Sequence, residues 1–350
     1  MFAANSSDPN YDIYLSIIQS RTYWISLAVF GFILDVLIIA GNSVLLYAIY
    51  KDPRNSLRTP PGLLVANLSV ADLLLGLFNV SLVAIRDVYR SELIHMPSLA
   101  ILKAVMYTVL TTTLFVSSNT IIAMSVTCYV AISSPMEYKA IITKKRIKIY
   151  FAVLWVMSLG TCVLPVTSVS EETYTMIYLH THATIPAILL TVVYVKVFRA
   201  LARRTRELQQ GGYDKMATKS LERERTMAFA VVTILALFYI TYIPQYITLH
   251  LLYFCKPCQE SLTFHEIDVA LSRFLFLNSA INPFVYSWRV PKYRQALRDC
   301  WRSCRGQPYG ITAQGSVSQS SQMNTSRIAQ NLFLSNTKRT QTDASEITSL

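Results

Sequence analysis

A few charged side chains lie inside long apolar stretches of this sequence, where they need partners other than water. Asp72 is one of them, and in the middle of a bilayer a carboxylate costs about 2.5–3.5 kcal/mol on insertion scales, so it should face other protein groups. Arg273 is another, and a lone arginine in such a stretch requires an anionic ligand or a carboxylate. Asp268 and Asp35 are carboxylates that could pair with it, so a ligand-binding and a structural role are both open.

Several uncharged polar residues could surround the Asp72 carboxylate. Asn278 and Asn282 are four residues apart, so a helix places both amides on one face. Asn42 and Ser117 lie within two further apolar runs. Together these residues could form one hydrated cluster. Alternatively, each of them bonds only to a neighbouring helix or to its own backbone, which is common between membrane helices.

The elements that must position these side chains are seven apolar runs. With 53% hydrophobic and 15% charged residues among 350, the chain has too much apolar surface for one soluble domain. Each run approaches or exceeds the roughly 20 residues that a membrane-spanning helix needs, and none alternates as a barrel strand would. The runs are residues 22–50, 59–85, 104–132, 149–170, 173–195, 226–255 and 269–288. We therefore expect an all-α membrane protein, a bundle of seven transmembrane helices.

Basic residues predict the orientation of this bundle. The loops after the first, third and fifth runs hold seventeen lysines and arginines, and the opposite side holds five before the seventh run. By the positive-inside rule the amino terminus lies outside and the carboxyl terminus in the cytoplasm. The net charge of +12 then reflects topology and contact with anionic inner-leaflet lipid, and no nucleic-acid partner is required. Asn5 begins a glycosylation sequon on the outer side.

The residues around the polar positions resemble those of the class A, or rhodopsin-like, G-protein-coupled receptors. The resemblance covers about residues 41–304, with motifs in six of the seven runs. The matching residues are Gly41-Asn42-Ser43-Val44, Asn67-Leu68-Ser69-Val70-Ala71-Asp72, Trp155, Pro186 with Tyr194, Phe238 with Pro244, and Asn282-Pro283-Phe284-Val285-Tyr286. The resemblance implies a receptor that transmits an extracellular ligand signal across the plasma membrane to a heterotrimeric G protein and arrestin, without a covalent cofactor.

The resemblance also implies roles for individual residues. In such receptors the acid of helix two binds an allosteric sodium ion with help from helices three and seven. The matching positions here are Asp72, Ser117, Asn278 and Asn282, and oxygen ligands suit a hard cation. Tyr194 and Tyr286 resemble two tyrosines that meet near the cytoplasmic end when helix six swings outward. Prolines permit the kinks that such a movement requires, and they are Pro186, Pro244 and Pro283.

The inner end of the third run departs from the family pattern. The family has Asp/Glu-Arg-Tyr there, and this chain has Thr127, Cys128 and Tyr129. Glu224 stands where the family's helix-six acid would pair with the missing arginine. Either G-protein coupling is altered, with raised basal activity, or coupling is maintained through other contacts.

A second departure concerns the outer disulfide of the family. Lys103 occupies the helix-three cysteine position, and residues 166–184 contain no cysteine, so that bridge cannot form. Cys255 and Cys258 lie in the third outer loop, and an oxidising exterior favours a bond between them. Two thiols, or a metal site completed by His265, are the alternatives. This pattern is partly similar to the adenosine, melanocortin and cannabinoid receptors.

The ligand pocket does not follow the amine, retinal or adenosine pattern. Amine receptors need an acid where this chain has Leu110, opsins a lysine where it has Phe276, and adenosine receptors an asparagine where it has Leu249. The remaining candidates for ligand contact lie toward the outer side. With Leu110 they are Lys103, His180, His182, Tyr242, His250 and Arg273. The histidines could instead sit at the membrane interface.

The carboxyl-terminal part predicts membrane contact followed by disorder. Residues 291–298 form an amphipathic pattern suited to the membrane surface, and Cys300 and Cys304 beside it are candidate palmitoylation sites. We expect four regions: an extracellular segment 1–21, the bundle 22–288, the surface helix 289–305 and a disordered tail 306–350. Thr348-Ser349-Leu350 is a candidate PDZ-domain ligand.

Two other function classes fit the sequence less well. A transporter or pump would need a chain of ionisable groups across the bilayer or an internal repeat, and neither is present. An enzyme would need a nucleophile with its base, or metal-ligand spacing, and the runs contain neither. We therefore expect a receptor that is not an enzyme, with the transporter as the alternative.

Overall fold

The computed structural model describes residues 20–52, 55–92, 100–161, 177, 180–210 and 215–305. The chain divides into two units, residues 1–297 and 298–350. In the described residues all regular secondary structure is helical, so the prediction of an all-α fold is confirmed.

Seven helical segments correspond to the seven apolar runs. They are α2 (Arg21–Lys51), α3–η1–α4 (Pro60–Leu75, Gly76–Val80, Ser81–Ser91), α5 (Ala100–Ser133), α7 (Lys144–Thr161), η3–α9 (His180–Thr184, Ile185–Gln210), α10 (Lys215–Phe254) and α12–α13 (Leu262–Phe274, Phe276–Arg289). Five of these segments are long and apolar enough by themselves to cross a membrane; α7 and the interrupted α12–α13 are not among them. Short helices α6 (Tyr138–Ile141) and α11 (Lys256–Gln259) lie in the connections, and α14 (Pro291–Cys304) follows the last segment.

Several helix ends differ from the predicted runs. The fifth run was predicted to end at Val195, whereas α9 continues to Gln210. The sixth was predicted to begin at Thr226, and α10 begins at Lys215. The physical reason is that hydropathy marks the part of a helix that lies in lipid, while arginine, lysine and glutamate are good helix formers that extend it into water. Of the fourth run, residues 162–170 lie outside the described residues.

Local sequence accounts for several helix boundaries. The Ser20 hydroxyl accepts a hydrogen bond from the Tyr23 N–H at 3.3 Å and so caps α2. Pro60 opens α3 at a position where the missing N–H has no cost. Between α3 and α4 the chain widens into the π-helical turn η1, where the Ser81 hydroxyl donates to the Gly76 carbonyl at 2.9 Å.

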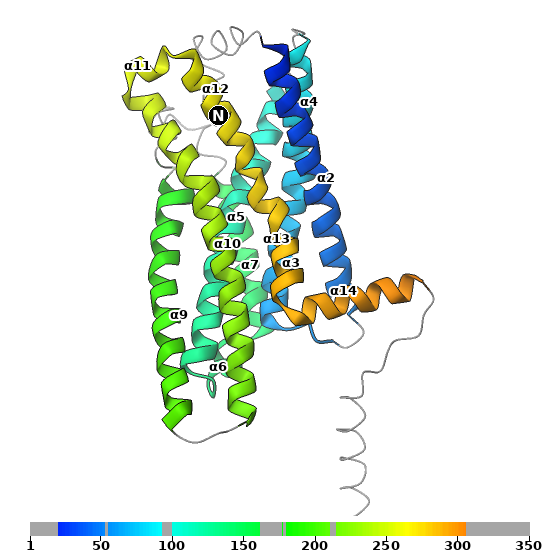
Figure 1. Ribbon diagram of the computed structural model, residues 1–350, viewed down its shortest axis with the longest axis vertical. Coiled ribbons are helices and arrows are strands. Elements are labelled where there is room, and N and C mark those ends of the chain that lie inside the picture. Colours follow the sequence, from blue (N-terminus) through cyan, green and yellow to red (C-terminus); the bar gives the residue numbers. More distant parts are fainter. Residues whose placement is uncertain are drawn as a thin grey trace, which may run out of the picture. The chain divides into compact units, whose positions relative to one another are not determined.

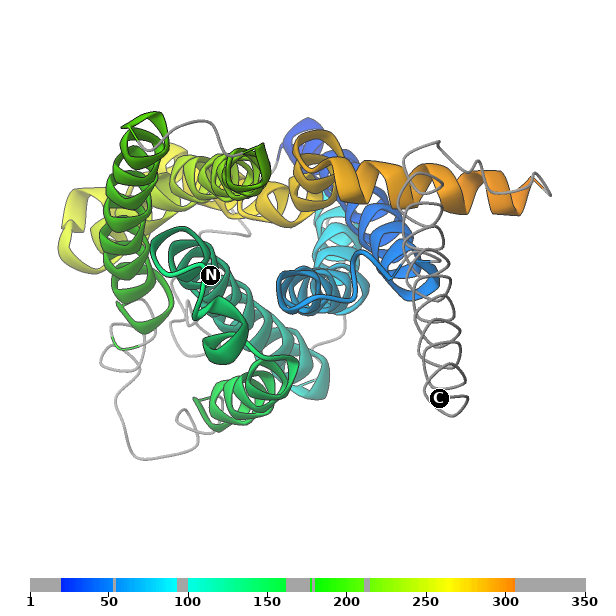
Figure 2. The same cartoon turned by 90° about the horizontal axis from the view of Figure 1, so that it is seen from below.

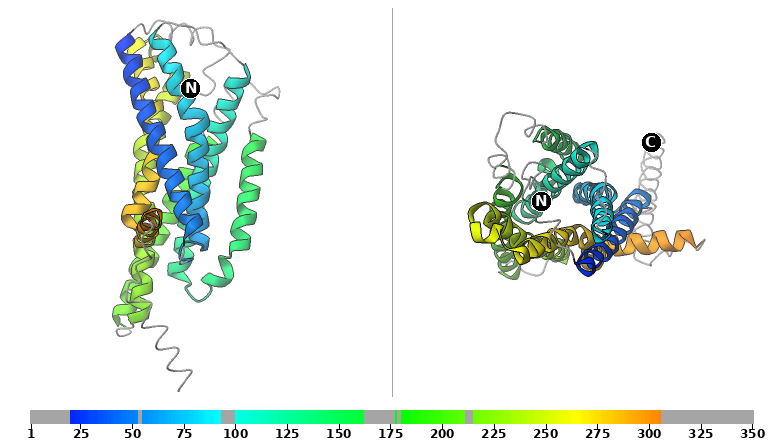
Figure 3. Two further views of the ribbon diagram at one scale, coloured as in Figure 1. Left: turned by 90° about the vertical axis from the view of Figure 1, so that its right-hand side faces the viewer. Right: turned by 90° about the horizontal axis from the view of Figure 1, so that it is seen from above.

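The helices pack around α5, which contacts α3, α7, α9 and α10 (Figures 1 and 2). On one side of the bundle α2 runs along α3, η1 and α4 (Figure 3), and α13 contacts α2, α3 and α10. Asn67 of α3 joins two of these neighbours, since its amide donates to the Thr120 hydroxyl at 2.8 Å and accepts from the Trp155 indole at 3.0 Å. This contact fixes α3 between α5 and α7.

The outward faces of the helices carry large apolar side chains. Examples on α2, α7, α9 and α10 are Val36, Val44, Val156, Met157, Ile188, Val192, Ile240 and Ile247. A soluble protein rarely exposes such extended apolar surface. The chain is a membrane protein, and lipid is the solvent of these faces.

Gly62, near the start of α3, is closely packed, whereas Gly160 of α7 is not. A Cβ at Gly62 would lie 1.7 Å from the Leu57 carbonyl oxygen, whereas a Cβ at Gly160 meets nothing within 4 Å. The Leu57 backbone is itself held by Asp52, whose carboxylate accepts its N–H at 2.6 Å. Gly62→Ala should therefore destabilise the protein by about 3 kcal/mol, as overpacking does, and lower the melting temperature in detergent.

The matched control is Gly160→Ala, in an open position of a helix. It should leave the melting temperature unchanged or raise it slightly, because alanine favours a helix by about 1 kcal/mol over glycine. Equal melting temperatures for the two variants would contradict the packing at Gly62.

Candidate functional site

A buried polar cluster surrounds Asp72 where α2, α3 and α13 meet. Asp72 is 1% exposed, and its Oδ2 accepts a hydrogen bond from the Asn282 amide at 2.8 Å. Asn42 is fully buried and donates to the Ile38 and Ser279 carbonyls at 3.0 and 3.3 Å. The proline that follows Asn282 leaves α13 without one backbone donor, so side chains supply much of the bonding here.

Several oxygen atoms of this cluster lack hydrogen-bond donors. Among the described residues, nothing donates to Asp72 Oδ1, Asn42 Oδ1 or Asn278 Oδ1, although all three atoms are buried. Buried acceptors without donors are rare in proteins and call for an ion or water. Carboxylate and amide oxygens are the ligands that a hard cation prefers, so the chemistry of Asp72 and Asn278 suits the expected sodium ion, which stays a prediction.

Ser117 is the weakest member of the expected sodium site. It lies on α5, half-buried, and within the described part of the chain its hydroxyl makes no hydrogen bond to the other three residues. The structure thus joins Asp72 and Asn282 by a hydrogen bond, and the sodium site as a whole, Ser117 included, stays a prediction.

Cys128 closes the inner end of the bundle by apolar contact. It is 6% exposed and packs with Ile132 of α5, Val197 and Leu201 of α9 and Ala228 of α10. Its Sγ lies 3.8 Å from the Glu224 carbonyl oxygen of α10, a weak hydrogen bond. The neighbouring Thr127 hydroxyl donates to its own helix, at the Ala123 carbonyl, and Tyr129 packs at the edge of the same cluster.

Glu224 forms no ion pair with another described residue. Burial and, as a smaller cause, the charge of Glu224 raise the pKa of Tyr138, the first residue of α6, to about 12. The phenol of Tyr138 is therefore close enough to Glu224 of α10 to interact with its charge. The family pattern predicts an ion pair between a helix-three arginine and a helix-six acid at this place. This chain has instead the Cys128 thiol, the Glu224 carbonyl oxygen and the Tyr138 phenol.

The two tyrosines expected near the cytoplasmic end are both buried. The Tyr286 hydroxyl donates to Met124 Sδ at 3.4 Å, and its ring lies 5.7 Å from that of Tyr293 in the first turn of α14. Tyr194 lies on α9 beside Phe198. Phe238 of α10 stacks on Tyr242 with ring centroids 4.9 Å apart, six residues before the in-helix Pro244.

Arg273 is paired with Asp87, a residue just beyond the predicted end of the second run. Its guanidinium donates to both carboxylate oxygens of Asp87 at 2.6–3.0 Å, with both side chains no more than 1% exposed. It also donates to the Ser272 hydroxyl at 2.7 Å. Arg90, stacked on the Trp24 ring, lies 3.9 Å from the same carboxylate. A bidentate arginine–carboxylate pair of this kind is stronger than a single charged hydrogen bond.

The predicted partners of Arg273 were wrong for a geometric reason. Asp268 is five residues away, which on a helix is about 140° around the axis, so it faces a different neighbour. Asp268 accepts instead from Gln245 and Thr248 of α10, at 2.8 and 2.7 Å. Asp35 accepts from Ser81 at 2.9 Å.

Comparison with known proteins decides the family. Residues 41–286 match the family described as the 7 transmembrane receptor (rhodopsin family). The chain belongs to this receptor family. The curated relatives include the adenosine receptors A2a of Canis lupus familiaris and Homo sapiens, each 24% identical over 77% of this chain and 70% of the relative. The adenosine receptor A2a of Equus caballus is 23% identical over the same shares.

The outer part of this receptor gathers a second group of predicted residues. The His180 and His250 rings are 5.9 Å apart, and His250 lies 4.1 Å from the Tyr246 ring. Thr184 donates to the Tyr246 hydroxyl at 3.1 Å and bonds His180 Nδ1 at 3.0 Å. These contacts join η3 to α10 through aromatic and imidazole groups, and a ligand-binding role for His180 and His250 stays a prediction.

The other residues expected at the ligand site are not part of this group. Leu110 is 7% exposed and packs in an apolar cluster with Leu34, Ile38 and Phe276. The side chains of Lys103 and His182 lie outside the described residues. Arg273 is saturated by Asp87 and is a poor ligand contact.

The remaining predicted residues are the two cysteines after α10 and the residues of the carboxyl-terminal part. Cys255 and Cys258 form a disulfide at the end of α10, and Nε2 of His265, the alternative metal ligand, donates to the Gln259 carbonyl oxygen at 2.8 Å instead. No group of three metal-binding side chains occurs in the described residues. Cys300 lies on α14. The side chain of Cys304, together with Asn5 and Thr348-Ser349-Leu350, lies outside the described residues.

Two buried residues escaped the sequence reading. Asp87 lies two residues beyond the predicted end of the second run at residue 85, although α4 continues to Ser91. Gln245, 2% exposed, was passed over because it follows Pro244 in an apolar run. Its position after the proline of helix six was the available signal, since a buried amide beside a kink must find a partner.

Removal of either member of the Arg273–Asp87 pair should strongly destabilise the receptor. Arg273→Met leaves the buried Asp87 carboxylate with only its longer contact to Arg90, and Asp87→Leu removes the carboxylate from the buried Arg273 guanidinium; breaking a buried pair in this way costs about 3–5 kcal/mol. The double variant Asp87→Leu with Arg273→Met replaces both charges by apolar groups and should recover most of that loss. The measurement is thermal unfolding of the purified receptor in detergent. A double variant as unstable as the sum of the single variants would contradict this coupling.

Proposed function

We propose that this receptor sits in the plasma membrane with its amino terminus outside, binds an extracellular ligand and activates a heterotrimeric G protein. The observation that carries the proposal is the family match over residues 41–286, together with a polar cluster around Asp72 at the centre of the bundle. Membership of a receptor family also argues against the transporter and enzyme alternatives.

We propose an outward movement of the inner end of α10 as the activating step. Asp268 holds the outer half of α10 through Gln245 and Thr248. The inner half is held by the apolar contacts of Cys128 and Ala228. Pro244 lies between these two regions and removes one backbone hydrogen bond, so the helix can bend there. This arrangement supports a hinge that moves the inner half while the outer half stays in place.

Coupling through Cys128 should differ from coupling through an arginine. A buried ion pair would hold α10 to α5 in the resting state, whereas a thiol contact to the Glu224 carbonyl is worth much less. The proposal is therefore a receptor with raised basal activity. The cytoplasmic tail would recruit arrestin, and its last residues, Thr348-Ser349-Leu350, would bind a PDZ domain.

A sodium ion bound at Asp72 is the second part of the proposal. Asp72 Oδ1 and the amide oxygens of Asn278 and Asn42 would supply its protein ligands. Such an ion would neutralise a carboxylate that lies in the middle of the membrane, and it would stabilise the folded receptor by mass action.

Cys128→Arg tests the coupling proposal. It places a guanidinium beside Glu224 and should lower basal G-protein turnover, measured as GTPγS binding in membranes with matched receptor amounts. Because the new charge also disturbs an apolar cluster, the double variant Cys128→Arg with Glu224→Gln is assayed in the same way. Without the Glu224 carboxylate, the introduced guanidinium has no acid to pair with, and basal turnover should return to the wild-type level. Identical basal turnover for wild type and Cys128→Arg, at equal melting temperature, would contradict it.

Asp72→Asn tests the sodium proposal independently of signalling. Replacing potassium chloride by sodium chloride at constant ionic strength should raise the melting temperature of the wild type, by the equivalent of about 1.4 kcal/mol at a tenfold excess over Kd. Asp72→Asn should abolish this shift, and Asp35→Asn, which removes a carboxylate outside the cluster, should retain it. A wild type that melts at the same temperature in both salts would refute sodium binding.

A further inference from the structure

Two imidazole rings lie close together where η3 meets α10. The ring centroids of His180 and His250 are 5.9 Å apart, and the ring planes form an angle of 61°. Imidazole nitrogens bind zinc at about 2.0–2.1 Å, so two rings that share one tetrahedral zinc ion have their centres about 5–6 Å apart. The spacing of this histidine pair therefore matches that of two ligands of one ion.

A hydrogen bond determines which nitrogen of the His250 ring is available to an ion. His250 Nδ1 lies 2.9 Å from the Tyr246 carbonyl oxygen. A carbonyl oxygen only accepts hydrogen bonds, so Nδ1 carries the proton and donates it. In the neutral ring Nε2 then keeps its lone pair.

His180 reaches the same protonation pattern through Thr184. The Thr184 hydroxyl has one hydrogen, which it donates to the Tyr246 hydroxyl at 3.1 Å. His180 Nδ1 lies 3.0 Å from the Thr184 oxygen and is therefore the donor in that contact. Within the described part of the chain, Nε2 of neither histidine makes a hydrogen bond. Both rings thus keep the nitrogen that a metal ion needs.

This bonding pattern is typical of histidines that bind metal ions. A ligating histidine donates its other N–H to a carbonyl or a similar acceptor, which fixes the tautomer and the orientation of the ring. The Tyr246 carbonyl and the Thr184 hydroxyl provide these acceptors here. Imidazole suits zinc and related transition metals, whereas magnesium and calcium prefer oxygen ligands.

The histidine pair is accessible at the end of the bundle that carries the disulfide. His180 is exposed and His250 is partly exposed. Cys255, five residues after His250, is bonded to Cys258, and a disulfide indicates the oxidising side of a membrane. An ion can therefore reach the pair from the extracellular solution, and water can fill the two positions of a tetrahedral ion that the histidines leave open.

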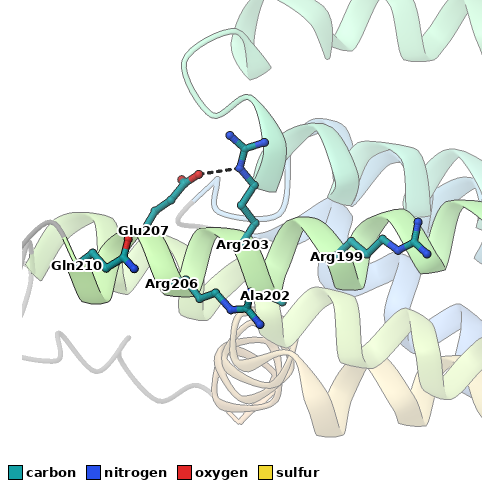
Figure 4. Close-up of a pocket in the computed structure, with 6 residues that line it drawn as sticks. All are labelled: Arg199, Ala202, Arg203, Arg206, Glu207 and Gln210. Carbon is teal, nitrogen blue, oxygen red and sulfur yellow. Dashed lines mark hydrogen bonds and ion pairs between the residues drawn. The ribbon is translucent and has the colours of Figure 1, made fainter.

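The other end of α9 has charged side chains but does not suit a metal ion. Figure 4 shows the residues of its exposed face, where Arg203 and Glu207 point toward each other. Arginine only donates hydrogen bonds and has no lone pair for a metal. Glu207 is the one carboxylate among the residues drawn there, and it accepts from Arg203 and Arg204 at 2.8 and 3.1 Å.

We propose that His180 and His250 bind a zinc ion from the extracellular solution through their Nε2 atoms, and that the ion joins η3 to α10. The source of the ion rests on the orientation proposed above. The site itself depends neither on the identity of the organic ligand nor on the coupling behaviour of Cys128, so its failure would leave the receptor function untouched.

Zinc titration of the purified full-length receptor tests the site. The receptor carries an epitope tag without histidine, is freed of metal with EDTA and is then titrated with zinc chloride in a calorimeter. His180→Asn or His250→Asn should weaken binding by at least about 100-fold, because the loss of an outer-shell partner alone costs 10–100-fold. Zinc should also raise the melting temperature of the wild type, and of neither variant, by mass action.

Two further variants separate a built site from adventitious binding. Thr184→Val keeps both rings but removes the acceptor of His180 Nδ1, and it should weaken zinc binding about tenfold. His95→Asn removes a histidine that the proposal does not use and should leave the affinity unchanged. If His95→Asn weakened binding as much as His180→Asn, the proposal would be wrong. It would also be wrong if the double variant His180→Asn with His250→Asn bound zinc as tightly as the wild type.

Folding and metal preference are measured separately. Because His180 is exposed, His180→Asn should melt at the wild-type temperature in EDTA, so that its loss of zinc binding cannot result from unfolding. A large excess of magnesium or calcium should leave zinc bound. Displacement of zinc by either ion would indicate oxygen ligands and overturn the assignment to the two histidines.

Discussion

The interior of a bilayer supplies no hydrogen-bond donor to a carboxylate, so every carboxylate buried in this bundle must find its donors on another helix. Three of them do so through the last segment, α12–α13. Asp72 of α3 accepts from Asn282, Asp87 of α4 accepts from Arg273, and Asp268 itself accepts from α10. The seventh segment is thereby tied to the second along its length and to the sixth near its outer end.

This distribution makes the two ends of the bundle mechanically different. At the outer end, polar contacts to Asp87 and Asp268 have defined geometry, and breaking them would leave a charge in a medium that cannot solvate it. At the inner end, Cys128 contributes apolar area and one weak bond to a carbonyl. Apolar contacts in lipid are exchanged for lipid contacts at little cost, because lipid tails are as apolar as leucine. A helix that moves at its inner end therefore disturbs few strong interactions.

The sequence predicted the helical class, the number of segments and the Cys255–Cys258 disulfide, because hydropathy and cysteine position are properties of the chain itself. It could not place Asp87. The helix of the second segment continues past the point where apolar residues end, and the π-helical turn Gly76–Val80 shifts the faces of the residues after it. The pairing of Arg273 was missed for the same reason, since it depends on how two distant helices are rotated against each other. The role of Gln245 could not be predicted either, because it depends on Asp268 of the neighbouring helix, to which the Gln245 amide donates.

The fifth segment links the inner contact with the membrane itself. Val197 and Leu201 on one face of α9 pack against Cys128, while the opposite face carries exposed apolar side chains such as Ile188 and Val192. Ala228 of α10 belongs to the same apolar cluster. A shift of α9 therefore changes the surface against which the inner end of α10 packs. Among the described residues, side-chain packing rather than an ion pair couples α5, α9 and α10 at this end.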